Sequence, residues 1–236
     1  MHTDYHRWYS HRLGRELGVV VYGHWGTPLV TFPTSGGDEW EMQNMGIVGA
    51  LAEHIEAGRV KLFSCNTNSR DSLYNRAAHP AHRSWMLRMF NEYVREEVAP
   101  FVWANCQSSG LGIGVAGMSL GAFYAMNVTL KHPDVFKRCY AISGLYDMKR
   151  FMDGQYDENF YFNNPVDYLP NLSDAWYWEH YRTCDIRIVT GSGPYEDKGS
   201  SLQLAHLLGS KHIPHALDDW GPLGGHDWPF WKHQLR

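Results

Sequence analysis

The sequence LGIGVAGMSLGAFYAM occupies residues 111–126 and contains a strand, a sharp turn and a helix in direct succession. Residues 111–116 form an apolar, strand-like run, and residues 122–126 have the composition of a helix. Between them, Gly117-Met118-Ser119-Leu120-Gly121 fits the pattern GxSxG. In this context the pattern predicts a nucleophile elbow, whose strained turn exposes the serine hydroxyl. Ser119 is therefore the candidate nucleophile; the alternative is an ordinary glycine-rich turn with an incidental serine.

Short β-branched runs alternate with helical stretches on both sides of this elbow. Such alternation is typical of the α/β class, with a mostly parallel central sheet flanked by helices, and the elbow specifies the α/β-hydrolase fold. The predicted strands are residues 17–22, 28–33, 60–65, 111–117, 139–143, 186–190 and 215–217. The predicted helices are residues 40–57, 81–98 (ending near Pro100), 120–131, 200–208 and 228–235.

The chain of 236 residues is expected to form a single domain, residues 1–236, with an aromatic-rich insertion at about residues 146–181. The regular pattern fails in this segment, which is dense in aromatic rings and asparagine. Long segments of this kind often cover a site. Two interpretations stay open: an ordered cover over the site, or rings that simply pack on the sheet.

The net charge of −4, without a block of like charges, argues against nucleic acid and anionic membrane surfaces as partners. The polar N-terminus lacks the pattern of a secretory signal, and no apolar run is long enough to cross a bilayer. We expect a cytoplasmic enzyme whose partner is a small-molecule ester, and a homo-oligomer is compatible with the sequence. The four cysteines lack CxxC pairs and are expected to be reduced thiols.

A serine hydroxyl needs a base to take its proton, so one of the 14 histidines must serve. His226 lies in Gly224-Gly225-His226-Asp227-Trp228, after the last predicted strand and before the terminal helix. In this fold the chain order is serine, acid, histidine. We therefore predict that His226 is the general base; the alternative is a histidine that caps its loop.

The acid of the triad should lie on the loop after the preceding strand, where it can accept the second imidazole N–H. That loop contains Glu196 and Asp197, and only one of the two can face His226. We favour Glu196 and keep Asp197 as the alternative. The other carboxylate is expected at the N-terminus of the following helix, with Ser200 or Ser201 as its cap.

Negative charge on the substrate oxygen needs fixed N–H donors. The amide of Leu120 directly follows the nucleophile and is one predicted donor. The second donor is predicted on the loop after residues 28–33, with Gly37 preferred and Gly36 next, because glycine lets a backbone amide approach a ligand closely. The alternative is a plain turn that requires positive φ.

These residues together resemble the putative-esterase family, which includes esterase D, feruloyl and acetyl-xylan esterases and the mycolyltransferases. The resemblance covers nearly the whole chain. It rests on the elbow and on the segments His132-Pro133-Asp134-Val135-Phe136, Ala141-Ile142-Ser143-Gly144, Gly225-His226-Asp227-Trp228 and Ser69-Arg70-Asp71-Ser72-Leu73-Tyr74-Asn75.

Two departures from the family pattern affect the site. The usual His-Gly before the oxyanion loop reads Ser35-Gly36 here, and an Asp common three residues after the strand-end glycine is replaced by Pro194. The resemblance implies ester hydrolysis through a serine acyl-enzyme, with no metal or organic cofactor. His79 and His82 have ligand-like spacing but lack a third ligand, so we expect surface histidines. An acyltransferase, a thioesterase and a non-catalytic binding module remain alternatives.

Overall fold

The computed structural model describes residues 1–235, which contain one eight-stranded sheet in the order β1-β2-β4-β3-β5-β6-β7-β8. β2 pairs antiparallel with both β1 and β4, and every other neighbouring pair is parallel. The strands are β1 (Thr3–Ser10), β2 (Arg15–Tyr22), β3 (Thr27–Phe32), β4 (Val60–Cys65), β5 (Ile113–Met118), β6 (Phe136–Ile142), β7 (Asp185–Thr190) and β8 (Ala216–Asp219).

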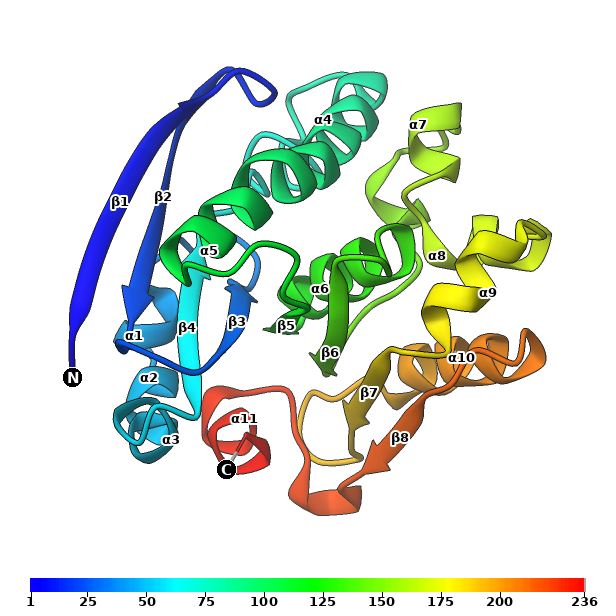
Figure 1. The fold of residues 1–236 in the computed structure, drawn as a ribbon. Helices are drawn as coiled ribbons and strands as arrows, with labels where there is room; N and C mark the ends of the chain where they lie inside the picture. Colours follow the sequence, from blue (N-terminus) through cyan, green and yellow to red (C-terminus); the bar gives the residue numbers. More distant parts are fainter. Residues whose placement is uncertain (236) are drawn as a thin grey trace.

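Helices cover both faces of this sheet (Figure 1). On one face lie α1 (Glu41–Asn44), α2 (Ile47–Ala50), α3 (Ala52–Glu56) and α11 (Trp228–Gln234). On the other lie α4 (Pro80–Tyr93), α5 (Ala99–Asn105), α6 (Leu120–Lys131) and α10 (Lys198–Ser210). The insertion carries α7 (Glu158–Tyr161), α8 (Pro165–Tyr168) and α9 (Ala175–Tyr181).

Alternation along the strands divides the core into two layers. In β2, Val19 and Val21 pack in the layer beside α4–α6, whereas Val20 and Tyr22 pack in the layer beside α1–α3 and α11. Successive side chains of a strand point to opposite faces, so a strand covered on both sides reads as a continuous apolar run. The architecture confirms the predicted α/β-hydrolase class. Within residues 1–235, no helix combines the length and apolar character needed to span a bilayer.

The structure differs from the prediction at three places. The edge strand β1 was not predicted, because most of its side chains are exposed and its sequence is polar. The single helix predicted at residues 40–57 is three short helices, interrupted at Gly46, which takes φ of 82°, and again at Leu51, whose backbone is not helical. The helix predicted to end near Pro100 continues through a π-helical turn, Val94–Val98, into α5. Pro100, which has no N–H to donate, lies directly after this π-helical turn.

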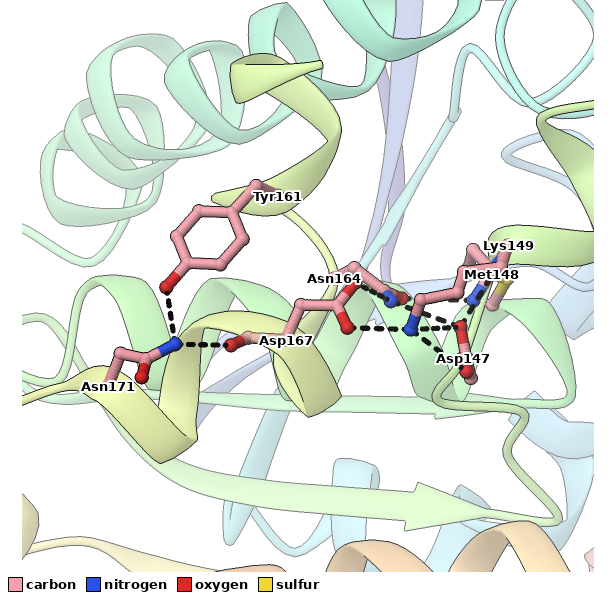
Figure 2. A network of polar contacts seen from close by, with 7 residues as sticks. All are labelled: Asp147, Met148, Lys149, Tyr161, Asn164, Asp167 and Asn171. Carbon is pink, nitrogen blue, oxygen red and sulfur yellow. Dashed lines mark hydrogen bonds and ion pairs between the residues drawn. The ribbon is translucent and has the colours of Figure 1, made fainter. Parts of the chain in front are cut away.

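The insertion at residues 146–181 connects β6 to β7 and packs on α4 and α6 rather than standing free. Its rings divide into two groups: Phe160 and Tyr168 are buried in the core, whereas Phe162 and Trp176 are exposed. Figure 2 shows a polar network that holds the segment in shape, with the buried amide of Asn164 at its centre. The insertion therefore contributes buried side chains to the core on this face of the sheet.

Candidate active site

The elbow at the end of β5 has the strained geometry expected of it. Ser119 lies between β5 and α6 with φ of 56° and ψ of −119°. Residues other than glycine rarely adopt this backbone conformation. A Cβ at Gly117 would overlap the backbone of Gly121, and one at Gly121 would overlap the carbonyl of Phe32. Both glycines are needed because the turn packs directly against its own helix and the end of β3.

His226 and Ser119 meet at the carboxyl edge of the sheet, although 107 positions separate them in sequence. Nε2 of His226 lies 3.0 Å from Oγ of Ser119, within hydrogen-bonding distance. The amide of His226 donates to the carbonyl of Pro194 at 2.9 Å, and its ring packs edge-on against Trp231 at 5.1 Å between centroids. The loop that carries the histidine is thus fixed to the loop that follows β7.

Glycines allow these two loops to interlock. The amides of Ser192 and Gly193 donate to the carbonyls of Gly221 and Gly224 at 2.7 and 2.8 Å. A Cβ at Gly191 would overlap the backbone of Gly224, so only glycine permits this approach. These hydrogen bonds join the loop after β7 to the loop that carries His226.

Glu196 lies on the other side of the imidazole from Ser119. Its Oε2 is 3.6 Å from Nδ1 of His226, within ion-pair range but longer than a hydrogen bond. Its Oε1 accepts a hydrogen bond from Oγ1 of Thr190 at 2.8 Å. The side chain is 1% exposed, whereas that of His226 is 31% exposed. The structure therefore brings Ser119, His226 and Glu196 together, with one ring nitrogen of the imidazole near the hydroxyl and the other near the carboxylate.

The surroundings of Glu196 favour its ionised form. Burial alone would raise the pKa of this carboxyl group, but the side chains of His226, Ser143 and Thr190 lower it. The lowering outweighs the burial, so the pKa of Glu196 lies below its ordinary value. Ser143 is itself positioned by the indole N–H of Trp231, which donates to its hydroxyl at 3.0 Å. A carboxylate is therefore present beside the imidazole at neutral pH.

Asp197 does not take part in this group. It is exposed and forms the N-cap of α10, where its carboxylate accepts the amide of Gly199 at 3.1 Å. The cap is thus Asp197 itself, and not Ser200 or Ser201 as predicted. Ser200 instead accepts the amide of Tyr146, and Ser201 is buried.

The loop after β3 differs from the prediction in which of its amides is free. The N–H of Gly37 donates to the carbonyl of Thr34 at 3.2 Å, closing a turn, and the N–H of Gly36 faces Oγ of Ser69 at 3.4 Å. Within residues 1–235, the N–H groups of Ser35, Asp38 and Glu39 in this loop have no hydrogen-bond partner, and neither does that of Leu120. The amides of Gly37 and Gly36, the predicted second donors, are thus engaged within the protein, whereas those of Ser35 and Leu120 are not.

Thr190, Ser143 and Ser35 were missed at the sequence level. Thr190 and Ser143 are buried polar residues at or just after the carboxyl ends of β7 and β6, and that position is the signal that could have identified them. Ser35 offers only its backbone, so no side-chain pattern marks it. Of the two histidines weighed as metal ligands, His79 has another role: its Nδ1 accepts a hydrogen bond from the amide of Ala81 and caps α4.

A strained serine at an elbow, facing a histidine across the carboxyl edge of a mostly parallel sheet, defines the class of serine hydrolases with the α/β-hydrolase fold. Comparison with family sequences gives the more particular assignment. The family described as "Putative esterase" matches residues 10–236. The chain belongs to this family, and it is an enzyme of the serine esterase type. No sequence among the curated proteins matches it.

Solved structures share this fold at low sequence identity. A ferulic acid esterase has a TM-score of 0.73 at 14% identity, with 99% of this chain and 95% of that chain covered. An S-formylglutathione hydrolase from Agrobacterium tumefaciens has a TM-score of 0.75 at 14% identity, with 99% and 91% covered. The fluorophosphonate-binding serine hydrolase F of Staphylococcus aureus has a TM-score of 0.70 at 18% identity, with 99% and 95% covered.

Proposed function

We propose that the protein hydrolyses small carboxylic esters through a serine acyl-enzyme, with Ser119 as nucleophile, His226 as general base and Glu196 as the orienting acid. The observation that carries this proposal is the 3.0 Å contact between Nε2 of His226 and Oγ of Ser119 on a strained elbow. The buried carboxylate of Glu196 on the opposite side of the ring supports the third role.

In the first half of the reaction, Oγ of Ser119 bonds to the ester carbonyl carbon while its proton passes to Nε2 of His226. The electron pair of the carbonyl moves onto its oxygen. When that pair returns, the bond to the alcohol oxygen breaks, and the imidazolium gives its proton to the leaving alcohol. Water then repeats the sequence on the acyl-enzyme and releases the acid. Glu196 stabilises the imidazolium that forms in each half.

The negative oxygen of each tetrahedral intermediate would be held by the amides of Leu120 and Ser35. Leu120 follows the nucleophile at the start of α6, where helix geometry leaves the first N–H groups without intrahelical partners. Ser35 follows β3, whose last residue, Phe32, pairs with Gly117 of the elbow. We therefore place the second donor at Ser35 instead of Gly37.

The test is turnover of p-nitrophenyl acetate by the parent protein and by Ser119→Ala and His226→Ala, with circular dichroism as the control for folding. Each variant should lose nearly all activity. A folded variant that keeps a near-parental rate would refute the role assigned to that residue. A thioester substrate and an added alcohol in the same series separate ester hydrolysis from thioester hydrolysis and from acyl transfer, which use the same three groups. A folded parent protein that turns over no substrate would instead indicate a binding module.

A further inference from the structure

The turn that follows β3 has a fixed shape. The hydrogen bond from the amide of Gly37 to the carbonyl of Thr34 closes it, and Gly36 takes φ of 73° at its third residue. Glycine is favoured at that position because other residues are strained there. Ser35 is the second residue, whose N–H a turn of this kind does not use. What holds the turn in place therefore decides where the Ser35 amide points.

Glu41, at the start of α1, binds the first residue of the turn at residues 34–37. Its two carboxylate oxygens accept the N–H of Thr34 at 2.7 Å and the hydroxyl of Thr34 at 2.8 Å. The carboxylate occupies the space that a Cβ at Gly37 would need. One side chain therefore fixes both the backbone and the hydroxyl of Thr34.

Arg70 and Ser69 hold the turn from the loop after β4. The guanidinium of Arg70 donates to the carbonyl of Gly36 through Nε at 3.1 Å and Nη2 at 2.6 Å. Oγ of Ser69 lies 3.4 Å from the amide of the same glycine. Both polar groups of the Gly36 backbone are therefore contacted by neighbours in one short segment.

This segment is itself anchored to α4 by buried side chains. The amide of Asn68 donates to the carbonyl of Met86 at 3.0 Å, and the hydroxyl of Ser72 donates to that of Arg83 at 3.0 Å. Asn68 and Ser72 are both fully buried. Ser69 and Arg70 thus lie between two residues that are hydrogen-bonded to α4, which gives the start of the segment Ser69-Arg70-Asp71-Ser72 a structural role.

We infer that Arg70 and Glu41 are positioning residues, which lock the turn at residues 34–37 so that the Ser35 N–H is held ready for the oxyanion. This inference rests on the proposed function. Neither side chain touches the reacting atoms in this account; each acts through the backbone of the turn. Preorganised donors of this kind contribute mainly in the transition state, because the charge they stabilise develops there.

The test compares Arg70→Gln with Arg70→Lys, and uses Arg88→Gln as the matched control. Arg88 is an exposed arginine on α4 that pairs with Glu92 and loses the same charge on substitution. Removal of a whole oxyanion donor lowers kcat about 100- to 1000-fold, so a displaced donor should lower it roughly 10-fold in Arg70→Gln. KM for p-nitrophenyl acetate should stay near the parental value. Arg70→Lys, which can reach one carbonyl, should recover part of the loss.

Hydrogen exchange of the peptide covering residues 33–38 gives a second readout that needs no activity. Faster exchange in Arg70→Gln, but not in Arg88→Gln, is the expected result. Unchanged exchange or unchanged kcat in Arg70→Gln would overturn the inference, as would a rise in KM confined to negatively charged esters, which would show direct contact with substrate. A folded parent protein without esterase activity would refute the proposed function, and exchange would still show whether Arg70 fixes the turn.

Discussion

Nδ1 of His226 lies 3.6 Å from Oε2 of Glu196, and only 1% of the Glu196 side chain is exposed. A buried carboxylate beside an imidazole holds the ring in one orientation and stabilises its protonated form. Asp197, the next residue, has a different partner in the first turn of α10. The geometry therefore separates two carboxylates that are adjacent in sequence.

This separation predicts opposite results for two isosteric substitutions. Glu196→Gln should lower kcat by roughly 10⁴-fold, because the amide can no longer stabilise the imidazolium. Asp197→Asn should leave kcat within about twofold of the parent, because asparagine caps a helix about as well as aspartate. Steady-state kinetics with p-nitrophenyl acetate measures kcat for both variants. Equal losses in the two variants would contradict the assignment of Glu196.

The elbow predicts that Gly121→Ala cannot be accommodated. The new methyl group would overlap the carbonyl of Phe32, so the backbone of the turn must shift; overpacking of this kind costs about 1–3 kcal/mol or more. Gly49→Ala is the matched control, since no atom lies within 4 Å of its added Cβ and alanine favours helix by about 1 kcal/mol. Urea unfolding and ester turnover measure both effects. A stable, fully active Gly121→Ala would show that the turn is looser than described.

The polar network in the insertion predicts that Asn164→Ala destabilises the fold. Its Oδ1 accepts the amide of Met148 at 2.9 Å, and its Nδ2 donates to Asp147 and Asp167 at 3.1 and 2.7 Å (Figure 2). Loss of these bonds should cost roughly 2–4 kcal/mol, because two of them involve charged groups.

Asn171→Ala provides the comparison for that network. Asn171 is exposed and donates to the hydroxyl of Tyr161 at 2.9 Å, so its substitution should cost less than about 1 kcal/mol. Denaturant unfolding gives the two free energies. If both variants lost the same amount, the buried amide would have no special role in ordering the insertion.

His132 predicts a loss of stability in acid. Burial, together with the nearby charges of Lys131 and Arg95, lowers the pKa of His132 to about 4 from its ordinary value of 6.5. Between these two pH values the unfolded chain binds a proton that the folded chain does not, so the free energy of unfolding falls as pH falls. The full shift corresponds to roughly 3 kcal/mol.

The contribution of His132 can be isolated by substitution. His132→Leu should unfold with a smaller decrease in stability between pH 6.5 and pH 4 than the parent, whereas His82→Leu, at an exposed position, should follow the parent. Urea unfolding at several pH values provides the comparison. Parallel pH profiles for the parent and His132→Leu would rule out this source of acid sensitivity.

Much of the fold could be predicted because both faces of the sheet are covered. Buried parallel strands are apolar throughout, and the predicted boundaries of β4 coincide with those in the structure. The edge strand β1 has no such signal, since it is solvated and polar. Gly46 breaks a pattern that is otherwise helical, and hydrophobic periodicity does not record where a backbone takes positive φ.

The site was predictable where a residue type and its chain position decide the chemistry, as for Ser119 and His226. A site residue was not predictable where adjacent residues of the same chemical type could fill one role. Glu196 and Asp197 differ only in which one the loop turns inward, and the N-cap of α10 depends on local backbone geometry. The second oxyanion donor depends on which amide a turn leaves free, and the side chains that fix this turn come from two other elements.

The most direct test of the central claim is covalent labelling of the intact protein with a fluorophosphonate, followed by mass spectrometry of its peptides. A hydroxyl activated by a histidine should displace fluoride and form a phosphonyl ester at Ser119 alone. His226→Ala should label far more slowly, and Ser119→Ala should not label. Folded parent protein without an adduct at Ser119, or with an adduct at another serine that survives Ser119→Ala, would contradict the account.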